Sequence, residues 1–263
     1  MGLFARFFGV IGHIGIMWAD ELGQMGRLVQ RTLFSLPRMR PEPVAVQMLR
    51  FGVRAVPIIS LVNLFVGMII AVSMSTTLVD FNMINETAKI VAIAVTKELG
   101  PLMTGLMMSG FAGAAIAAEI ASMNVNEEIL ALEAGALSPI RFLVLPRVVG
   151  VMVMMMCLTL IADVMGMLGG FAVGTTMLHI SPQQYREITD HSIEWLDIPK
   201  GLIKAAAFGL IITIVACRQG LSAEGGALGV GRATTTAVVR SIVCIIAANL
   251  CFTILFYWTL TGK

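Results

Sequence analysis

The chain is 263 residues long, with 57% of them hydrophobic and only 13% charged. Such a composition excludes a water-soluble domain of this length, and the net charge of +2 gives no indication of a nucleic-acid partner. Several apolar runs are long enough to cross a hydrocarbon core of about 30 Å, and lysines and arginines gather between them. We therefore expect an all-α integral membrane protein that forms a single domain over residues 1–263.

The N-terminal segment, residues 1–40, is expected to form a helix that lies in the membrane interface. Its apolar start is interrupted by Arg6 and His13 and is too short to span the bilayer. A signal peptide is the alternative, but no convincing small-residue cleavage site precedes Asp20. Arginines then recur as far as Arg54, and the positive-inside rule therefore places this region in the cytoplasm.

Five apolar runs follow, each with the length and composition of a membrane-spanning helix. The second is rich in small residues at every fourth position, a pattern that lets helix backbones approach closely in lipid. Five crossings from a cytoplasmic N-terminus place Lys263 on the outer, periplasmic side. The expected spans are 58–78, 88–118, 148–177, 198–217 and 237–260.

Lys97 and Glu98 lie within the second expected span. Ionisable groups at membrane depth cost several kcal/mol unless they face a cavity or a partner, so we expect them to line a substrate path, with Pro101 kinking the helix. The alternative is that they reach the outer headgroups or form structural ion pairs. Neighbouring residues point about 100° apart on a helix, so the two are not expected to pair with each other.

Asp163 in the third span and Lys204 in the fourth are further ionisable residues at membrane depth. We expect Asp163 to be hydrogen-bonded within the bundle. A relay of these charges in an ion-coupled secondary transporter is an alternative function. The histidines and cysteines lack ligand-like spacing, so no metal site is predicted.

A short helix over residues 124–134 is predicted between the second and third spans. Asn124 is placed to cap it, and Gly135 supplies a stop. Acidic residues in the first turn and apolar residues at helical spacing would let it lie across the membrane surface or bind a partner, although an ordinary connecting helix has the same pattern. The residues expected to serve such a contact are Glu127, Glu128, Ile129, Leu132 and Glu133.

The glycine-rich stretch from Glu224 to Arg232 is interpreted as a loop before the fifth span. It lacks the residue order of a phosphate-binding loop and has no strand before it, so a nucleotide site is not expected there. The chain therefore carries no ATP-binding motif of its own.

Three motifs resemble those of the MlaE/YrbE permeases, the membrane subunits of Mce-type ABC transporters. The first runs from Glu119 through Leu132 to Leu145-Pro146-Arg147, the second is Lys97-Glu98-Leu99-Gly100-Pro101, and the third begins at Gly229-Val-Gly231-Arg232. The motifs occur in the same order as in the family, and the similarity covers nearly the whole chain.

The resemblance implies a homodimer in the bacterial inner membrane, with an interfacial helix, five spanning helices and a cytoplasmic coupling helix in each copy. It also implies two ATPase subunits that bind ATP and Mg, a hexameric periplasmic ring of Mce-domain protein, and a small STAS-domain accessory. The cargo would be phospholipid or a related hydrophobic molecule. This chain itself would be a transporter subunit that binds no cofactor and is not an enzyme.

The resemblance also assigns roles to individual residues. Glu98 and Leu99 would face the lipid pocket, and Lys97 stands where relatives often have arginine, which changes how a phosphate is bound because lysine lacks the bidentate fork. Residues 124–134 would be the coupling helix, although Leu130 stands where many relatives have an acidic residue. A membrane scaffold that only anchors a periplasmic ring is the remaining alternative.

Overall fold

The computed structural model describes residues 20, 23–35, 41–81 and 83–261, and in these residues every regular element is helical. The prediction of an all-α fold is confirmed. Five of the helical stretches are long and apolar enough to cross a membrane in the described part of the chain, as expected. They are Pro41–Asp80, Glu86–Val125, Ile140–Thr176, Asp197–Leu221 and Gly226–Tyr257.

Three of the five spans contain π-helical turns, and so each is divided into several elements. The first comprises α2 (Pro41–Gln47), η2 (Met48–Gly52), η3 (Val53–Ala55, a 3₁₀ turn) and α3 (Val56–Asp80). The second comprises α4 (Glu86–Ala94), η4 (Val95–Leu99), α5 (Gly100–Met108), η5 (Ser109–Gly113) and α6 (Ala114–Val125). The remaining elements are α7 (Glu128–Ala134), η6 (Ile140–Val144), α8 (Leu145–Thr176), α9 (Pro182–Ser192), α10 (Asp197–Leu221) and α11 (Gly226–Thr261).

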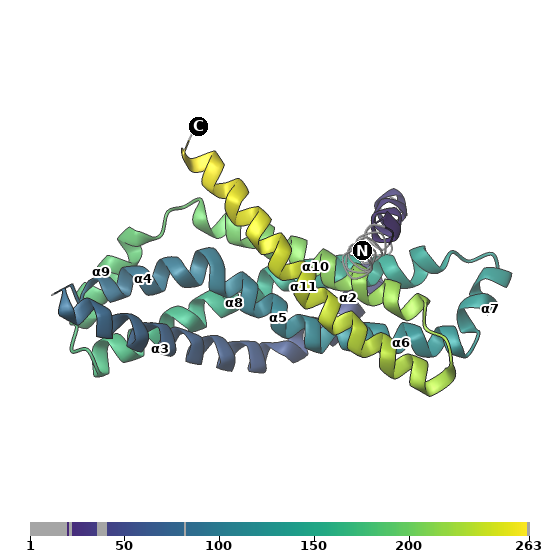
Figure 1. The fold of residues 1–263 in the computed structure, drawn as a ribbon, viewed down its shortest axis with the longest axis horizontal. Helices are drawn as coiled ribbons and strands as arrows, with labels where there is room; N and C mark the ends of the chain where they lie inside the picture. Colours follow the sequence, from purple (N-terminus) through teal and green to yellow (C-terminus); the bar gives the residue numbers. More distant parts are fainter. Residues whose placement is uncertain (1–19, 21–22, 36–40, 82, 262–263) are drawn as a thin grey trace, which may run out of the picture.

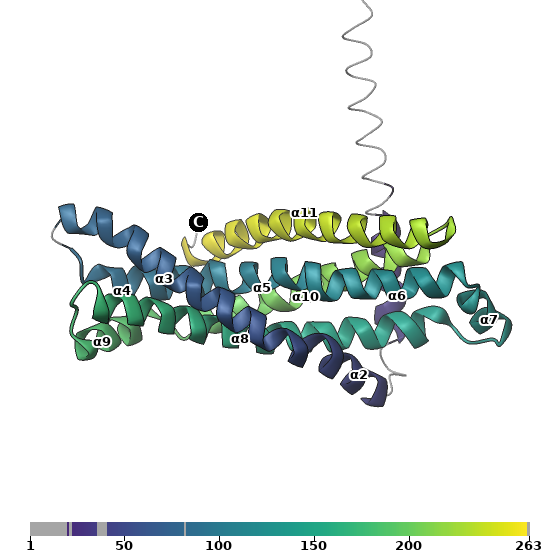
Figure 2. The same ribbon diagram turned by 90° about the horizontal axis from the view of Figure 1, so that it is seen from below.

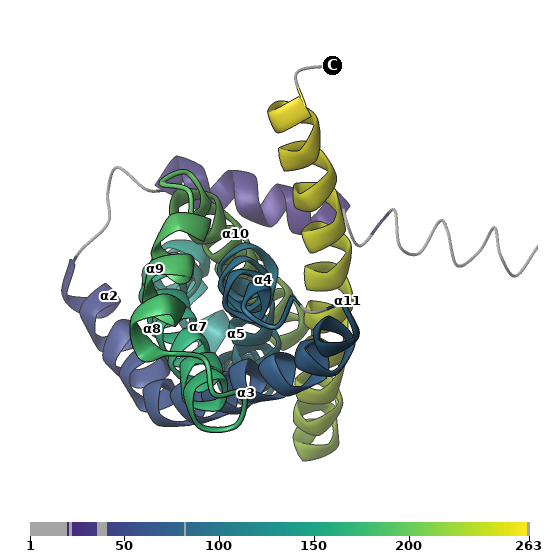
Figure 3. The ribbon, with the colours of Figure 1, turned by 90° about the vertical axis from the view of Figure 1, so that its left-hand side faces the viewer.

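The spans form an elongated bundle with short helices at its two ends. Figure 1 shows α7 at one end and α9, beside α4, at the other. Viewed along the bundle, α4 and α5 lie in the middle, with α3, α8, α10 and α11 around them (Figure 3). In Figure 2, α11 lies along one side of the bundle. Only 11% of its most apolar stretch of 18 residues is buried, against 61% of the corresponding stretch in α10. The exposed side of α11 is therefore open to lipid or to another chain.

α3 and α8 approach so closely that no side chain fits between them at their contact. A methyl group added to Gly67 would lie 1.8 Å from the carbonyl oxygen of Gly166, and one added to Gly169 would lie 2.1 Å from the carbonyl oxygen of Leu64. Because lipid supplies no hydrophobic force between helices, such close van der Waals contact is the main source of their attraction. The contact extends along much of α8 and defines one wall of the bundle.

The last span begins earlier than predicted. Gly225 and Gly226 have φ values of 89° and 68°, which an L-residue with a side chain rarely adopts, and they form the turn after α10. α11 then starts at Gly226, so the stretch up to Arg232 is helical and the loop interpretation was wrong. The glycines of this stretch lie in the first turns of α11, and the helix then continues into a long apolar run.

The short helix between the second and third spans was predicted over residues 124–134, and it starts later, at Glu128. α6 continues through Asn124, whose side-chain amide donates to the carbonyl oxygen of Ala223 at 3.0 Å and does not cap a helix. The residue before α7 is Glu127, with φ of 60°, and its side chain makes no capping hydrogen bond. The chain therefore reverses sharply at Glu127, and α7 has about two turns in place of three.

The predicted interfacial segment lies largely outside the described residues. The described helix over residues 23–35 crosses the bundle beside α10 (Figure 3). Leu28 packs in the main core cluster, and the side chains of Gln24 and Arg218 form a hydrogen bond. Leu33 and Phe34 are 59% and 78% exposed. The exposed side of this helix therefore carries two apolar residues near its end, next to the exposed arginines Arg27 and Arg31.

We predict that Gly67→Ala lowers the free energy of unfolding by about 1–3 kcal/mol, the usual effect of overpacking a tight contact. The cause is the carbonyl oxygen of Gly166, which the added methyl group would meet. Thermal unfolding of the detergent-solubilised protein measures the change. Gly110→Ala is the control, because a methyl group there meets nothing within 4 Å. Equal stability of the two variants would contradict the packing described.

Candidate functional site

A break in the helical hydrogen-bond pattern sets the geometry of the polar residues in the second span. Pro101 has no N–H, so it cannot donate to the carbonyl of Lys97 one turn earlier. The chain adopts the π-helical turn η4 before this proline, with Gly100 N–H donating to the carbonyl of Val95. A kink was predicted at Pro101, and the structure has a π-helical turn at residues 95–99 directly before it. The carbonyl of Lys97 lacks the α-helical N–H donor that another residue at position 101 would supply.

Lys204 on α10 supplies the missing donor. Its side chain is 2% exposed, and Nζ donates to the carbonyl of Lys97 at 3.2 Å. The same ammonium donates to Glu98 Oε1 at 2.7 Å and to Thr253 Oγ1 at 3.0 Å. Three acceptors match the three donors of an ammonium group, so the buried charge is fully hydrogen-bonded.

Glu98 is held from α11 as well as from α10. Asn249 Nδ2 donates to Glu98 Oε2 at 3.0 Å, and Thr253 Oγ1 donates to Glu98 Oε1 at 2.9 Å. The carboxylate thus has partners on both oxygens and joins the second, fourth and fifth spans. Its side chain is still 36% exposed, so it is structurally fixed and remains accessible to a ligand.

Lys97 forms an ion pair with a different acid, because neighbouring residues on a helix point about 100° apart. Its Nζ lies 3.2 Å from Asp197 Oδ1, and the Lys97 side chain is 35% exposed while that of Asp197 is 2% exposed. Asp197 begins α10, where a negative charge is stabilised by the helix dipole, and its other oxygen accepts from the backbone N–H of Glu194 at 3.1 Å. Lys97 and Glu98 therefore do not pair with each other.

Lys97 stands between two cavities. The first, which we call the Glu98 cavity, has a volume of about 180 Å³. It is lined by Lys97, Glu98, Asp197, Lys200, Lys204, Thr253, Phe256 and Tyr257. The second lies between α4 and α9, measures about 640 Å³ and is lined by charged residues that include Lys89, Lys97, Glu187 and Glu194. Both cavities lie in the half of the bundle opposite α7, and the Glu98 cavity combines charged groups with aromatic walls, as an amphiphilic ligand requires.

Leu99, the third residue of the predicted pocket, is half-buried in η4 and does not line the Glu98 cavity. Sequence reasoning missed Asn249 and Thr253, the two partners of Glu98 on α11. Their spacing of four residues in an apolar span was the available signal, because it places both on one face of the helix. Lys200 was missed as well, although it lies one turn before Lys204.

Asp163 corrects an expectation. It is 7% exposed on α8, and its Oδ1 has no hydrogen-bond partner among the described residues. The oxygen lies against Gly100, where an added methyl group would meet it at 1.7 Å. The predicted hydrogen bond within the bundle is therefore not made by this oxygen, and Asp163 packs directly against Gly100, the first residue of α5.

At the opposite end of the bundle, ion pairs to Glu119 hold three elements together. Arg50 Nη1 lies 2.9 Å from Glu119 Oε1, and Arg147 Nη2 lies 3.2 Å from Glu119 Oε2. Arg147 is 4% exposed and also donates from Nη1 to the carbonyl of Leu143 at 2.7 Å. These contacts join η2, α6 and α8 next to α7.

Two apolar residues of α7 face the bundle. Ile129 is 7% exposed and belongs to the core cluster, against which Leu132 also packs. Glu127, Glu128 and Glu133 are exposed, and Leu130 is 62% exposed. The surface offered to a partner is therefore acidic with one apolar residue, Leu130, which was not among the predicted contact residues.

In the described part of the chain, no group of three His, Cys, Asp or Glu side chains stands close enough to hold a metal ion. The polar cluster at Glu98 is therefore best described by its ion pairs and hydrogen bonds.

Comparison with known proteins supplies the context of this site. A family model described as Permease MlaE matches residues 44–255. A probable ABC transporter permease protein of Rickettsia felis is 41% identical over 249 residues, 94% of this chain and 96% of the relative. The permease protein MlaE of the intermembrane phospholipid transport system of Haemophilus influenzae is 29% identical over 258 residues, 97% of this chain and 99% of the relative. The chloroplast protein TRIGALACTOSYLDIACYLGLYCEROL 1 of Arabidopsis thaliana is 30% identical over 80% of this chain and 60% of its own length.

The ion pair between Lys204 and Glu98 makes a prediction about stability. Glu98→Leu should lower the free energy of unfolding by about 2–3 kcal/mol, somewhat less than the 3–5 kcal/mol typical of a fully buried pair, because Glu98 is 36% exposed. Lys204→Met in the same chain should restore part of the loss, since no unpaired charge then remains, although the carbonyl of Lys97 loses its donor.

Thermal or denaturant unfolding in detergent gives the coupling free energy from this double-mutant cycle. Lys89→Met is the matched control, because the ion pair of Lys89 with Glu86 is exposed and contributes little. Additive losses in the Glu98 and Lys204 variants would contradict the pairing.

Proposed function

This chain belongs to the MlaE permease family of ABC transporters, and from that premise we propose that it moves phospholipids or related hydrophobic molecules between the inner and outer membranes of a bacterium. It is a multi-pass inner-membrane protein and a transporter subunit, not itself an enzyme. Energy comes from a partner ATPase, and so the ion-coupled alternative is set aside. The phospholipid assignment rests on the name of the Haemophilus relative and on the Glu98 cavity.

The observation that carries the proposal is a cavity between membrane-spanning helices whose lining combines charged groups with aromatic rings. We propose that Lys97, Glu98 and Leu99 contribute to the lipid site. Lys97 is 35% exposed and already neutralised by Asp197, so it can share its charge with a lipid phosphate without leaving an unpaired ion when the site is empty. Phe256 and Tyr257 would contact the first carbons of the acyl chains.

We propose that residues 124–134 couple the permease to the ATPase, with contacts from the exposed face of α7. Glu127, Glu128 and Glu133 would meet basic residues of the ATPase, and Leu130 would fill an apolar depression. Ile129 and Leu132, which were predicted as contacts, would act indirectly by holding α7 against the core. Closure of two ATPase subunits around ATP would then press the α7 helices of two copies together and repack the bundle.

The proposed assembly is a homodimer with two ATPases that bind ATP and Mg, a hexameric periplasmic Mce-domain ring and a STAS-domain accessory. In the homodimer, the second copy would replace lipid on part of the apolar outer faces of α3 and α11, which include Phe65, Ile69, Val243 and Leu250, each at least 47% exposed. The Glu98 cavity is lined partly by α11, so a second copy against α11 would close it from the side. Each cavity would then belong to a larger chamber between the two copies.

We further propose that the α7 end faces the cytoplasm, which places the N-terminus inside and the C-terminus in the periplasm. Arg50, Arg147 and Arg218 gather at the α7 end, whereas α9 at the opposite end carries a single arginine, Arg186. This distribution follows the positive-inside rule.

Native mass spectrometry of the protein extracted gently from its own membrane tests this proposal. We expect a dimer that carries two ATPase subunits, a ring protein and bound phospholipid. A complex that retains the ring but neither an ATPase nor lipid, even after mild reconstitution, would favour a membrane scaffold and contradict the transport proposal.

The exposed face of α7 yields a prediction that separates coupling from folding. Leu130→Arg together with Glu133→Lys should reduce ATP-dependent lipid transfer by about tenfold or more, equivalent to roughly 1.4 kcal/mol of interface energy. The melting temperature should change little, because both side chains are exposed. Transfer between proteoliposomes and acceptor vesicles measures the effect.

Ile129→Ala is the matched control for this variant. Because Ile129 is buried, its truncation should lower the melting temperature. Full transfer activity in the Leu130 and Glu133 variant would refute the proposed role of α7.

A further inference from the structure

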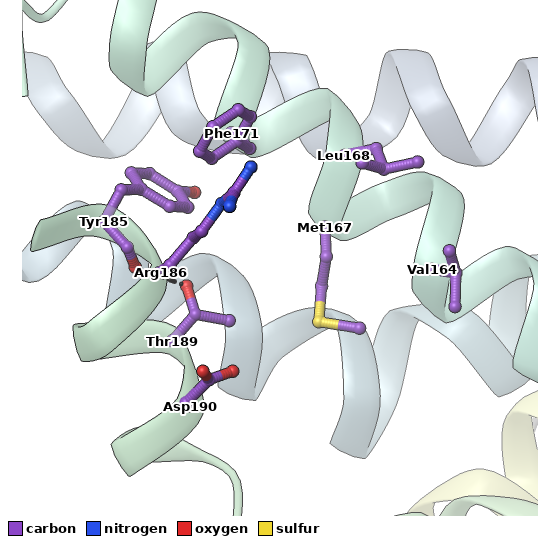
Figure 4. Close-up of a pocket in the computed structure, with 8 residues that line it drawn as sticks. All are labelled: Val164, Met167, Leu168, Phe171, Tyr185, Arg186, Thr189 and Asp190. Carbon is purple, nitrogen blue, oxygen red and sulfur yellow. Dashed lines mark hydrogen bonds between the residues drawn. The ribbon is translucent and has the colours of Figure 1, made fainter. Parts of the chain in front are cut away.

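A groove between α8 and α9 lies apart from the Glu98 cavity and has no role in the proposed transport path. It has a volume of about 220 Å³. α8 lines one wall with Val164, Met167, Leu168 and Phe171, and α9 lines the other with residues that include Arg186 and Asp190 (Figure 4). Apolar groups therefore form the wall within the membrane-spanning helix, and charged groups lie at the end of the bundle.

The apolar wall continues along the outer face of α8. Leu160, Val164 and Leu168 recur at every fourth position and are 42%, 53% and 49% exposed. Residues at this spacing lie above one another on a helix, about 6 Å apart, so they form one stripe that leads from the groove toward the middle of the span. Such a stripe is placed to contact a hydrocarbon chain along its length.

The charged end of the groove carries two exposed side chains of opposite charge, Arg186 and Asp190. The guanidinium carbon of Arg186 lies 5.5 Å from the ring centroid of Phe171, and Arg186 forms no ion pair within the described residues. Figure 4 shows the two side chains next to each other. Asp190 follows one turn later on α9 and forms no ion pair there either. A guanidinium is suited to a phosphodiester, and a nearby carboxylate is suited to an ammonium. The two residues thus match the charges of a zwitterionic phospholipid headgroup.

α9 is held rigidly enough for the groove to exist before a ligand binds. Tyr185 is 3% exposed and packs edge-on against Phe171, with ring centroids 5.5 Å apart. Its ring occupies the space over Gly174, where an added methyl group would meet the ring at 2.4 Å. Burial raises the pKa of Tyr185 to about 12, so the phenol stays neutral.

The polarity of the groove favours a lipid as its occupant. Its apolar wall lies on a membrane-spanning helix, and its charged side chains lie on α9 at the end of the bundle. A single acyl chain with a headgroup at one end has the narrow shape and the polarity that the two walls require.

We propose that the α8–α9 groove is a second lipid site, which binds one membrane phospholipid from the side with its phosphate on Arg186 and an acyl chain along Val164 and Leu168. The groove uses none of the residues of the Glu98 cavity, so the proposal stands whether or not this chain transports lipid. It concerns a resident lipid that occupies the outer rim of the bundle.

Fluorescence quenching in vesicles tests the proposal with the full-length protein. Leu168→Trp introduces an indole at the groove, and the signal of the parent protein is subtracted. The probes are brominated phosphatidylethanolamine and brominated diacylglycerol with identical chains, each diluted in phosphatidylcholine. We expect the phosphatidylethanolamine to bind about threefold to fivefold more strongly, the range that an exposed charge contact provides.

Arg186→Gln in the same background should abolish this preference, whereas the control Lys89→Gln, which removes an exposed cation of the same end of the bundle, should retain it. Equal quenching by the two probes, or a preference that survives Arg186→Gln, would overturn the proposal. Complete loss of quenching by both probes when the ring protein is added would assign the groove to a protein partner and would also overturn it.

Discussion

Buried polar groups inside the membrane-spanning bundle depend on partners from the protein itself, and this constraint explains how the second span is built. Pro101 removes one N–H from the helix, and the carbonyl of Lys97 is satisfied by the side chain of Lys204 from a neighbouring span. The ammonium that enters for this purpose is itself a buried charge, and Glu98 neutralises it. A backbone irregularity, a buried cation and a partly exposed carboxylate therefore depend on one another, and together they create a polar site in an apolar bundle.

The two ends of the bundle differ in how closely their elements are held together. At the α7 end, Glu119 joins Arg50 and Arg147, so the element that precedes α7 is held at a fixed distance from η2 and α8. At the other end, α9 leaves cavities on both of its sides, toward α4 and toward α8. The tight end is suited to receive force from a partner, and the looser end is suited to admit a ligand.

Much of this arrangement could be predicted from the sequence, and the failures have physical causes. The free-energy cost of charge at membrane depth identified Lys97 and Glu98. Their partners Asp197 and Asn249 could not be assigned, because pairing across spans depends on the packing of helices far apart in the chain. Local capping rules favoured a helix start at Asn124, but the carbonyl of Ala223 offered its side chain a tertiary partner and α6 continued. Helical periodicity placed Ile129 and Leu132 on one side without indicating that this side faces the core.

The covalent path between the two ends favours a direct mechanical link in the proposed transport cycle. The stretch from α4 to α6 carries Lys97 and Glu98 near one end and Glu119 near the other, and it leads through Glu127 into α7. Only the π-helical turns η4 and η5 interrupt its α-helical pattern. Such turns are the positions at which a long helix bends most readily, and η4 is the turn that holds the polar site. A displacement of α7 would therefore move α6 as a rigid rod and be absorbed at η5 or at η4, where any change of pitch alters the contacts of Glu98 with Lys204.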